Sequence, residues 1–163
     1  MGEDRRLAAF EGAFRSFTEC IRDLPEDRFL APMETGSPRD LVARLIGWNR
    51  LTVLGSKSIL DGKPPPYHTD FANGYQRVNS ELVAREASNE RGPLLETLEK
   101  TKLEMVKALQ AIPADAWNSD RGVRHPDGGP ATVRRCLEEL TRDYLDATDE
   151  ISIWLETAGK TPR

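Results

Sequence analysis

The sequence contains two histidines and two cysteines, residue types that often act in catalysis or bind metal ions. The only histidines, His68 and His125, fall in segments that we expect to be loops, where a surface position is the default for His125. The cysteines, Cys20 and Cys136, show neither a CxxC motif nor the spacing of a zinc site. We expect both to be reduced and to act as small apolar residues. The sequence shows no Ser/His/Asp arrangement, phosphate-binding glycine loop or HExxH motif.

Three further residues lie on apolar stripes and are candidates for a site. Trp48 and Asn49 belong to the second predicted helix and Tyr144 to the last. A Trp on such a stripe usually packs in the core, but beside a cleft its ring would form a wall. A buried Asn needs hydrogen-bond partners. The Tyr144 hydroxyl would either donate a proton in a site or only cap the core.

Periodic apolar residues predict the long helices that would position these side chains. Pro25 ends the first helix, Ser37 and Pro38 begin the second, and Gly92-Pro93 disfavours an uninterrupted third. The predicted helices cover residues 4–24, 38–60, 70–112 with a break near 88–93, and 132–158. Because such wide apolar faces must be buried against one another, we predict a single all-α domain over residues 1–163, a four-helix bundle.

Charge and hydropathy limit the classes of partner. The net charge is −4, and 23 Lys and Arg residues are scattered among 27 Asp and Glu residues. Binding to a nucleic-acid backbone needs a clustered basic surface, so we expect no nucleic-acid partner. No run of 18 apolar residues is present, so we expect no membrane partner. The first residues lack the apolar segment of a secretory signal, and we expect a cytoplasmic protein.

The second predicted helix contains a recognisable run, Pro38-Arg39-Asp40-Leu41-Val42-Ala43-Arg44-Leu45-Ile46-Gly47-Trp48-Asn49. It resembles the helix-two signature of the DinB-like superfamily and is most similar to the ClbS/DfsB family, in which an LIGWN run is common. The similarity extends over nearly the whole chain, including Leu109, Ile112, Pro113 and Trp117, and later Arg142-Asp143-Tyr144 through Ile151 and Trp154. The resemblance implies an up-down-down-up bundle, frequently a homodimer, with a cleft at one end of the helices.

The resemblance also implies chemistry. Many superfamily members hold a divalent metal with three histidines, one on helix two and two on helix four, and the ClbS-like branch is associated with cyclopropane hydrolysis that protects against a genotoxic metabolite. At the matching positions this sequence has Arg44, Asp143 and Ala147. Arginine has no acceptor atom, alanine has no ligand atom, and one carboxylate alone is not a metal site. We therefore expect no metal and no cofactor.

The same superposition would place Arg44 and Asp143 opposite one another on two helices. A semi-buried pair of this kind can form bidentate hydrogen bonds. One interpretation is a structural brace that replaces the metal, and it is the one we favour. The other is that Arg44 binds an anionic group of a ligand, such as a carboxylate, in the pocket that holds the metal in other superfamily members. His68 would lie about 25 Å along helix two from the level of Arg44, so it cannot complete this site unless its loop folds back a long way.

These observations lead to two functional hypotheses. In the first, the chain is a ClbS/DfsB-like small-molecule protein, either a metal-independent hydrolase or a resistance protein that sequesters a toxic compound. In the second, it is a non-catalytic, dimeric binding or interaction module. An open cavity would favour the first and a packed seam between helices two and four the second. The pocket candidates are Arg44, Trp48, Asn49, Asp143 and Tyr144.

Overall fold

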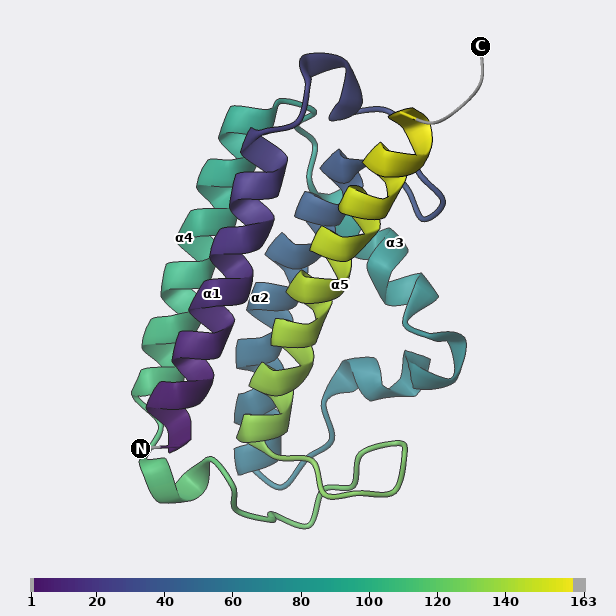
Figure 1. The fold of residues 1–163 in the computed structure, drawn as a ribbon. Helices are drawn as coiled ribbons and strands as arrows, with labels where there is room; N and C mark the ends of the chain where they lie inside the picture. Colours follow the sequence, from purple (N-terminus) through teal and green to yellow (C-terminus); the bar gives the residue numbers. More distant parts are fainter. Residues whose placement is uncertain (1, 160–163) are drawn as a thin grey trace.

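Four long helices form an antiparallel bundle in the computed structural model, which describes residues 2–159 (Figure 1). The helices are α1 (Gly2–Arg22), α2 (Pro38–Leu60), α4 (Arg91–Gln110) and α5 (Val133–Gly159). In Figure 1, α1 and α5 run in one direction along the bundle, and α2 and α4 run in the other. The predicted up-down-down-up bundle is therefore confirmed. Residue 1 and residues 160–163, the two ends of the predicted domain, lie outside the described residues.

The second helix begins where its sequence predicts, at a capping box. The Ser37 hydroxyl accepts from the Asp40 backbone N–H at 3.1 Å, and an Asp40 carboxylate oxygen accepts from the Ser37 backbone N–H at 3.2 Å. Pro38 occupies the first helical position, where its missing N–H has no intrahelical partner to lose. These local contacts determine where α2 begins, and hence the position of each of its residues along the bundle axis.

The connection from α2 to α4 differs from the predicted helix over residues 70–112. It contains a 3-10 helix, η2 (Pro66–Asn73), and a short α-helix, α3 (Gln76–Arg85), before α4 begins at Arg91. Gly74 and Tyr75 both adopt left-handed backbone conformations, with φ of 63° and 62°. Such residues cannot continue a right-handed helix, so residues 70–73 end η2 instead of beginning a long helix. This segment, residues 61–90, is the crossover that returns the chain along the bundle (Figure 1).

Asp70 links the two parts of the crossover. One of its carboxylate oxygens accepts from the Val78 backbone N–H at 3.0 Å, and the other accepts from the Asn73 amide at 3.3 Å. The hydrogen bond from Val78 is the largest cause of a lowered pKa of Asp70. Asp70 therefore caps α3 from a distance in sequence, which fixes the angle between η2 and α3.

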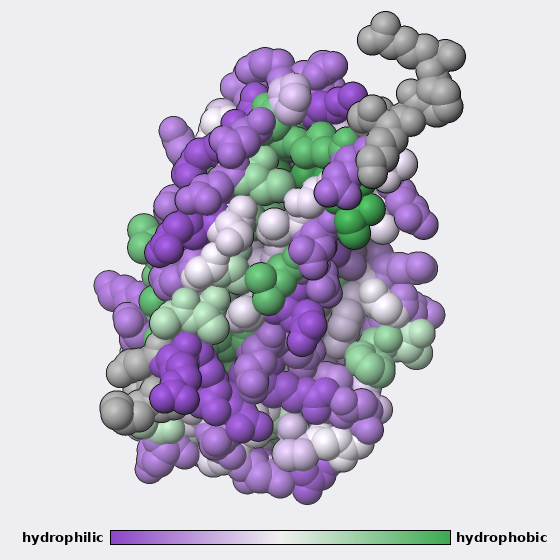
Figure 2. Space-filling view, viewed as in Figure 1, coloured by the Kyte–Doolittle hydropathy of each residue, from purple (hydrophilic) through white to green (hydrophobic). Residues whose placement is uncertain are grey.

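The bundle core is dominated by aromatic and branched side chains of α1 and α5. Phe10 and Phe17 contact Tyr144 edge-on, with ring centroids 5.4 and 5.7 Å apart. On the face in Figure 2 the hydrophobic residues form a broken band between α1 and α5 on an otherwise hydrophilic surface. None of the helices within residues 2–159 is long and apolar enough to cross a lipid bilayer.

Two buried glycines on α2 allow the crossover to lie against the bundle. A Cβ atom at Gly47 would lie 2.8 Å from Cγ of Leu82 in α3, and one at Gly55 would lie 3.0 Å from Cζ of Tyr67 in η2. Neither distance is compatible with a side chain at the glycine unless its neighbour moves. The absence of a side chain at Gly47 and Gly55 therefore determines where the crossover packs against α2.

Replacing Gly47 by alanine tests this arrangement. Gly12, in α1, has nothing within 4 Å of its Cβ position, so Gly12→Ala should stabilise the protein by about 0.5–1 kcal/mol through helix propensity. Gly47→Ala gains the same propensity but collides with Leu82, and should lose about 1–3 kcal/mol instead. Urea unfolding of both variants measures the difference. Equal stabilisation by the two substitutions would show that α3 is not docked on Gly47.

Candidate functional site

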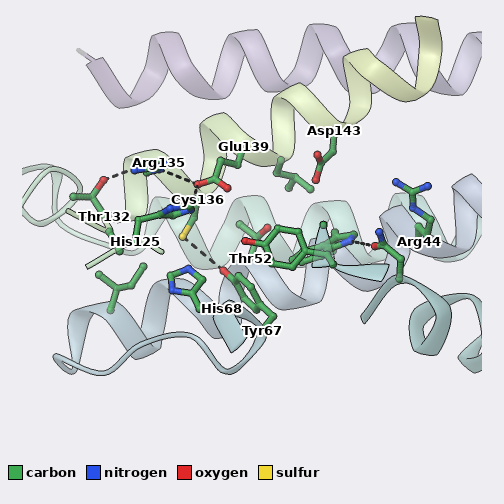
Figure 3. Close-up of a pocket in the computed structure, with 17 residues that line it drawn as sticks. Arg44, Thr52, Tyr67, His68, His125, Thr132, Arg135, Cys136, Glu139 and Asp143 are labelled. Carbon is green, nitrogen blue, oxygen red and sulfur yellow. Dashed lines mark hydrogen bonds and ion pairs between the residues drawn. The ribbon is translucent and has the colours of Figure 1, made fainter. Parts of the chain in front are cut away.

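The crossover, α2, α5 and the loop before α5 enclose a cavity of about 170 Å³ (Figure 3). In Figure 3, Arg44 lies at one end of the site, while His68 and His125 lie at the other. Asp143 and Glu139 lie along the α5 side. Most of its functional groups are partly or wholly buried, which strengthens electrostatic interactions inside it.

An aromatic cluster forms the middle of the cavity wall. The Trp48 ring meets Tyr67 and Tyr75 edge-on, with centroids 5.1 and 5.3 Å apart. The Trp48 indole N–H donates to the Asn79 side-chain oxygen at 2.7 Å. The crossover thus contacts Trp48 from η2, through Tyr67, and from α3, through Asn79. The edge-to-face contacts and the indole hydrogen bond together fix the orientation of the Trp48 ring.

The two histidines meet at the far end, with ring centroids 5.1 Å apart. His125 is only 4% exposed, so the expected surface position is wrong. Its Nδ1 accepts from the Asp127 backbone N–H at 3.2 Å, so a neutral ring carries its proton on Nε2. That Nε2 lies 3.3 Å from a Glu139 carboxylate oxygen, but the two are not aligned for a hydrogen bond.

His68 reaches the cavity because its loop folds back along α2, but it lies at the opposite end of the site from Arg44 (Figure 3). Its Nδ1 is buried and has no hydrogen-bond partner among the described residues. Burial, followed by the proximity of His125 and Arg135, lowers the pKa of His68 to about 4. His68 is therefore a neutral acceptor or donor at neutral pH.

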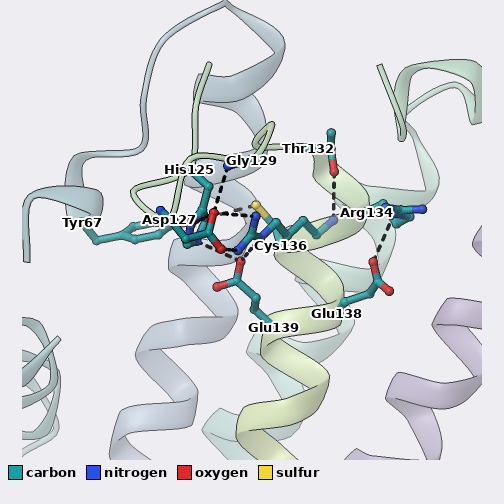
Figure 4. Close-up of polar contacts among 10 residues, drawn as sticks. Tyr67, His125, Asp127, Gly129, Thr132, Arg134, Cys136, Glu138 and Glu139 are labelled. Carbon is teal, nitrogen blue, oxygen red and sulfur yellow. Dashed lines mark hydrogen bonds and ion pairs between the residues drawn. The ribbon is translucent and has the colours of Figure 1, made fainter. Parts of the chain in front are cut away.

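A network centred on Arg135 holds the loop over the histidine end (Figure 4). The guanidinium bonds the Asp127 carboxylate through both of its terminal nitrogens, and its Nε donates to Glu139 at 3.0 Å. The hydrogen bond from Arg135 is the main cause of a strongly lowered pKa of Asp127. Asp127 also accepts from the Gly129 backbone N–H at 3.1 Å. Arg135 therefore ties the loop to α5, although its sequence context is typical of a solvated helix face.

Arg44 and Asp143 line the same cavity but do not form the bidentate pair of the brace interpretation. Within the described part of the chain, no hydrogen bond and no ion pair within 4.0 Å joins them, and the Arg44 Nε is buried without a partner. Burial raises the pKa of Asp143 to about 7, and the charge of Arg44 only partly opposes this effect. Asp143 is therefore a carboxyl group that exchanges its proton near neutral pH.

The structure places Asn49 and Tyr144 behind the cavity, in the bundle core. The Tyr144 hydroxyl donates to the Asn49 side-chain oxygen at 2.8 Å, and the Asn49 amide donates to the Thr101 hydroxyl at 3.0 Å. Both residues are fully buried, and burial raises the pKa of Tyr144. Of the five pocket candidates, Arg44, Trp48 and Asp143 line the cavity, whereas Asn49 and Tyr144 satisfy one another beside it.

Cys136 lines the cavity as a thiol. Burial raises its pKa to about 11, so little of it is thiolate at neutral pH. Its sulfur lies 4.0 Å from the Tyr67 hydroxyl, whose pKa burial also raises. Cys20 and Cys136 are both free. Because its thiol remains protonated, Cys136 is better suited to line the cavity and form a hydrogen bond than to act as a nucleophile.

The residues at the positions where the sequence resemblance implies metal ligands do not fit a metal ion. Arg44 offers only donors, Asp143 a single carboxyl group and Ala147 no ligand atom. The described residues contain no group of three or more His, Cys, Asp or Glu side chains that could hold one.

Comparison with known proteins shows similarity at the level of structure. No family model matches the sequence, and no curated protein matches it. The structure is similar to that of the colibactin self-resistance protein ClbS in complex with a double-stranded DNA, with a TM-score of 0.74 and 19% identity over 91% of this chain and 92% of that one. An uncharacterised protein from Escherichia coli UTI89 gives a TM-score of 0.72 and 19% identity over 96% and 94%. The chain therefore has a ClbS-like fold, as its sequence resemblance predicted.

The ClbS complex corrects the expectation of no nucleic-acid partner. A protein of this fold has been crystallised with double-stranded DNA, so the exclusion of nucleic acid was wrong. It rested on a net charge of −4, but binding to phosphates depends on where cations cluster and not on their sum over the chain.

Proposed function

We propose that this protein is a small-molecule hydrolase or sequestering protein that works in the cavity between α2, the crossover and α5. The observation that carries the proposal is a pair of buried side-chain nitrogens, on Arg44 and His68, that lack hydrogen-bond partners among the described residues, while both residues line this cavity. Buried polar groups in native proteins are normally satisfied, so a bound polar ligand would supply what they lack. An enclosed cavity with these groups favours this function over an interaction module without a small-molecule site.

Asp143 is the group best suited to move a proton in this cavity. A catalytic acid or base is most effective when its pKa lies near the working pH, and the pKa of Asp143 is about 7. His68 has a pKa of about 4, so its neutral ring is a weak base at that pH and is suited to hydrogen-bonding a water molecule.

The ClbS-like fold and sequence resemblance suggest a strained electrophilic ring as substrate. Hydrolysis of an activated cyclopropane breaks one ring C–C bond: the oxygen of water bonds to one carbon, and a proton is delivered to the other. Protonated Asp143 would supply that proton, and His68 would orient the attacking water, whose lost proton passes to solvent. Solvent then restores the proton of Asp143, so the reaction needs no oxidant, reductant or cofactor.

A ring-opening assay tests the hydrolase proposal. Incubation with a cyclopropane carrying two carbonyl groups in ¹⁸O-labelled water should give a ring-opened alcohol containing the label. Asp143→Asn should slow the reaction about a hundredfold or more, whereas Asp149→Asn, at an exposed position on the same helix, should leave it unchanged. Binding without ring opening would identify sequestration instead. A protein that neither binds the cyclopropane nor opens it would contradict the proposal.

Double-stranded DNA is a second candidate partner, supported by the ClbS complex and by one basic cluster. Arg5 and Arg6 of α1 and Arg142 of α5 line a groove between the two helices. Nothing in the described structure forms an ion pair with these three arginines, and Glu138, which also lines the groove, is paired with Arg134 at 3.2 Å. An unpaired cluster of this kind can contact phosphates despite the negative total charge.

Fluorescence anisotropy with a labelled 20-base-pair duplex tests this second function. Affinity should fall with rising salt, and replacing both Arg6 and Arg142 by Glu should make the log–log salt slope shallower by about two. Arg77→Glu, an exposed position on α3, serves as the control and should leave the slope unchanged. If the double variant has the same salt slope as the wild-type protein, this groove is not a DNA-binding site.

A further inference from the structure

The cavity opens to the surface beside Arg44. Arg44, Gly74 and Asn79 line both the enclosed cavity and an open groove along α3. A molecule that enters through this groove therefore passes the Arg44 guanidinium before it reaches the aromatic cluster. The end with His68 and His125 lies opposite Arg44, beside the loop that Arg135 holds (Figure 3).

Arg44 at this opening has an unused positive charge. It forms neither a hydrogen bond nor an ion pair within the described part of the chain, and its Nε is buried. A guanidinium remains charged, and its planar set of donors matches a carboxylate in two parallel hydrogen bonds. The residue is half-buried and only its Nε is fully enclosed, so its guanidinium nitrogens are available to an anion on the ligand.

The other charges around the cavity leave this role to Arg44. Arg135 is already engaged by Asp127 and Glu139. In the outer groove, Asp40 accepts from the Ser37 backbone N–H and pairs with Arg39 at 3.2 Å. Asp143 shares the cavity with Arg44, and its protonated form would accommodate an anion nearby without repulsion.

The size and shape of the cavity limit what can accompany the anion. A cavity of about 150 Å³ lined by apolar side chains holds benzene, so the present cavity of about 170 Å³ takes one six-membered ring. The edge-to-face cluster of Trp48, Tyr67 and Tyr75 provides flat apolar surfaces for it. Beyond the ring, His68 Nδ1 remains without a hydrogen bond among the described residues, and a polar substituent would supply one.

We propose that the cavity recognises a single planar ring with a carboxylate at one end, bound by Arg44, and a polar substituent at the other, bound by His68. This inference rests on the proposed function in that it names the part of the substrate that the same cavity holds. A larger substrate would extend from the carboxylate end into the open groove.

Three probes and an NMR titration test this assignment. The shift of the Trp48 indole N–H should follow 4-hydroxybenzoate binding, whereas 4-hydroxybenzamide, without the charge, should bind at least about tenfold more weakly. Benzoate, without the hydroxyl, should bind more weakly than 4-hydroxybenzoate. Arg44→Gln should remove the preference for the carboxylate and leave amide binding unchanged. Arg50→Gln, on the same helix but exposed, is the matched control and should retain the preference.

Arg44→Lys keeps a charge but loses the planar fork, and provides a second variant if Arg44→Gln does not fold. It should show an intermediate preference. Equal binding of acid and amide by the wild-type protein, or a preference that survives Arg44→Gln, would overturn the inference. Because binding is measured without turnover, a carboxylate preference in a protein that opens no cyclopropane would uphold the ligand class and reject only the hydrolase.

Discussion

The close approach of the crossover to α2 is the contact on which the rest of the site depends. It is possible because Gly47 and Gly55 have no side chains where Leu82 and Tyr67 lie. A helix bundle alone buries its apolar stripes and leaves no enclosed space between α2 and α5. By bringing η2 and α3 against α2, the two glycines place Tyr67, His68 and Tyr75 opposite Trp48. The cavity therefore results from a missing Cβ at two positions more than from any catalytic motif.

Burial by that crossover also sets the chemistry of the enclosed groups. The pKa of Asp143 rises because its carboxyl group loses water, and Arg44 stands too far away to form an ion pair that would restore the charge. The pKa of His68 falls for the same reason. On the opposite side, Arg135 forms close ion pairs with Asp127 and Glu139. Charges at the loop are thus mutually satisfied, whereas those inside the cavity are left for a ligand.

The helices of the bundle could be predicted from the sequence because their signals are local. The Ser37 cap, the apolar stripes and the breaks at proline depend on residues within a few turns of one another. The crossover was not predictable in this way, because two left-handed residues, Gly74 and Tyr75, end η2 where the apolar pattern suggested a helix start. The proline run before Tyr67 and the small residue at Gly55 were the available signals that a loop folds back.

The site was predicted only in part. Trp48 could be linked to Arg44 through the helix-two signature, and Asp143 through its match to a helix-four histidine position, but the depth of each residue in the bundle depends on tertiary packing. Asn49 and Tyr144 therefore turned out to be hydrogen-bonded core residues. His125 lacked any local signal, since its burial depends on the Arg135–Asp127 contact that folds its loop inward.

The pKa of Asp143 is the most direct test of this account, and a ¹³C NMR titration of its carboxyl carbon, assigned with Asp143→Asn, measures it. The account predicts a midpoint of about 7 and a still higher one in Arg44→Gln, which loses the opposing positive charge. In the unfolded chain the carboxyl group of Asp143 titrates near 3.8. At a pH between 3.8 and about 7, folding is therefore accompanied by uptake of a proton on Asp143. The contribution of Asp143 to stability is then present at low pH and lost as pH rises through 7. A midpoint near 4 would show that the carboxyl group remains hydrated, and would contradict both the enclosed cavity and its acid–base role.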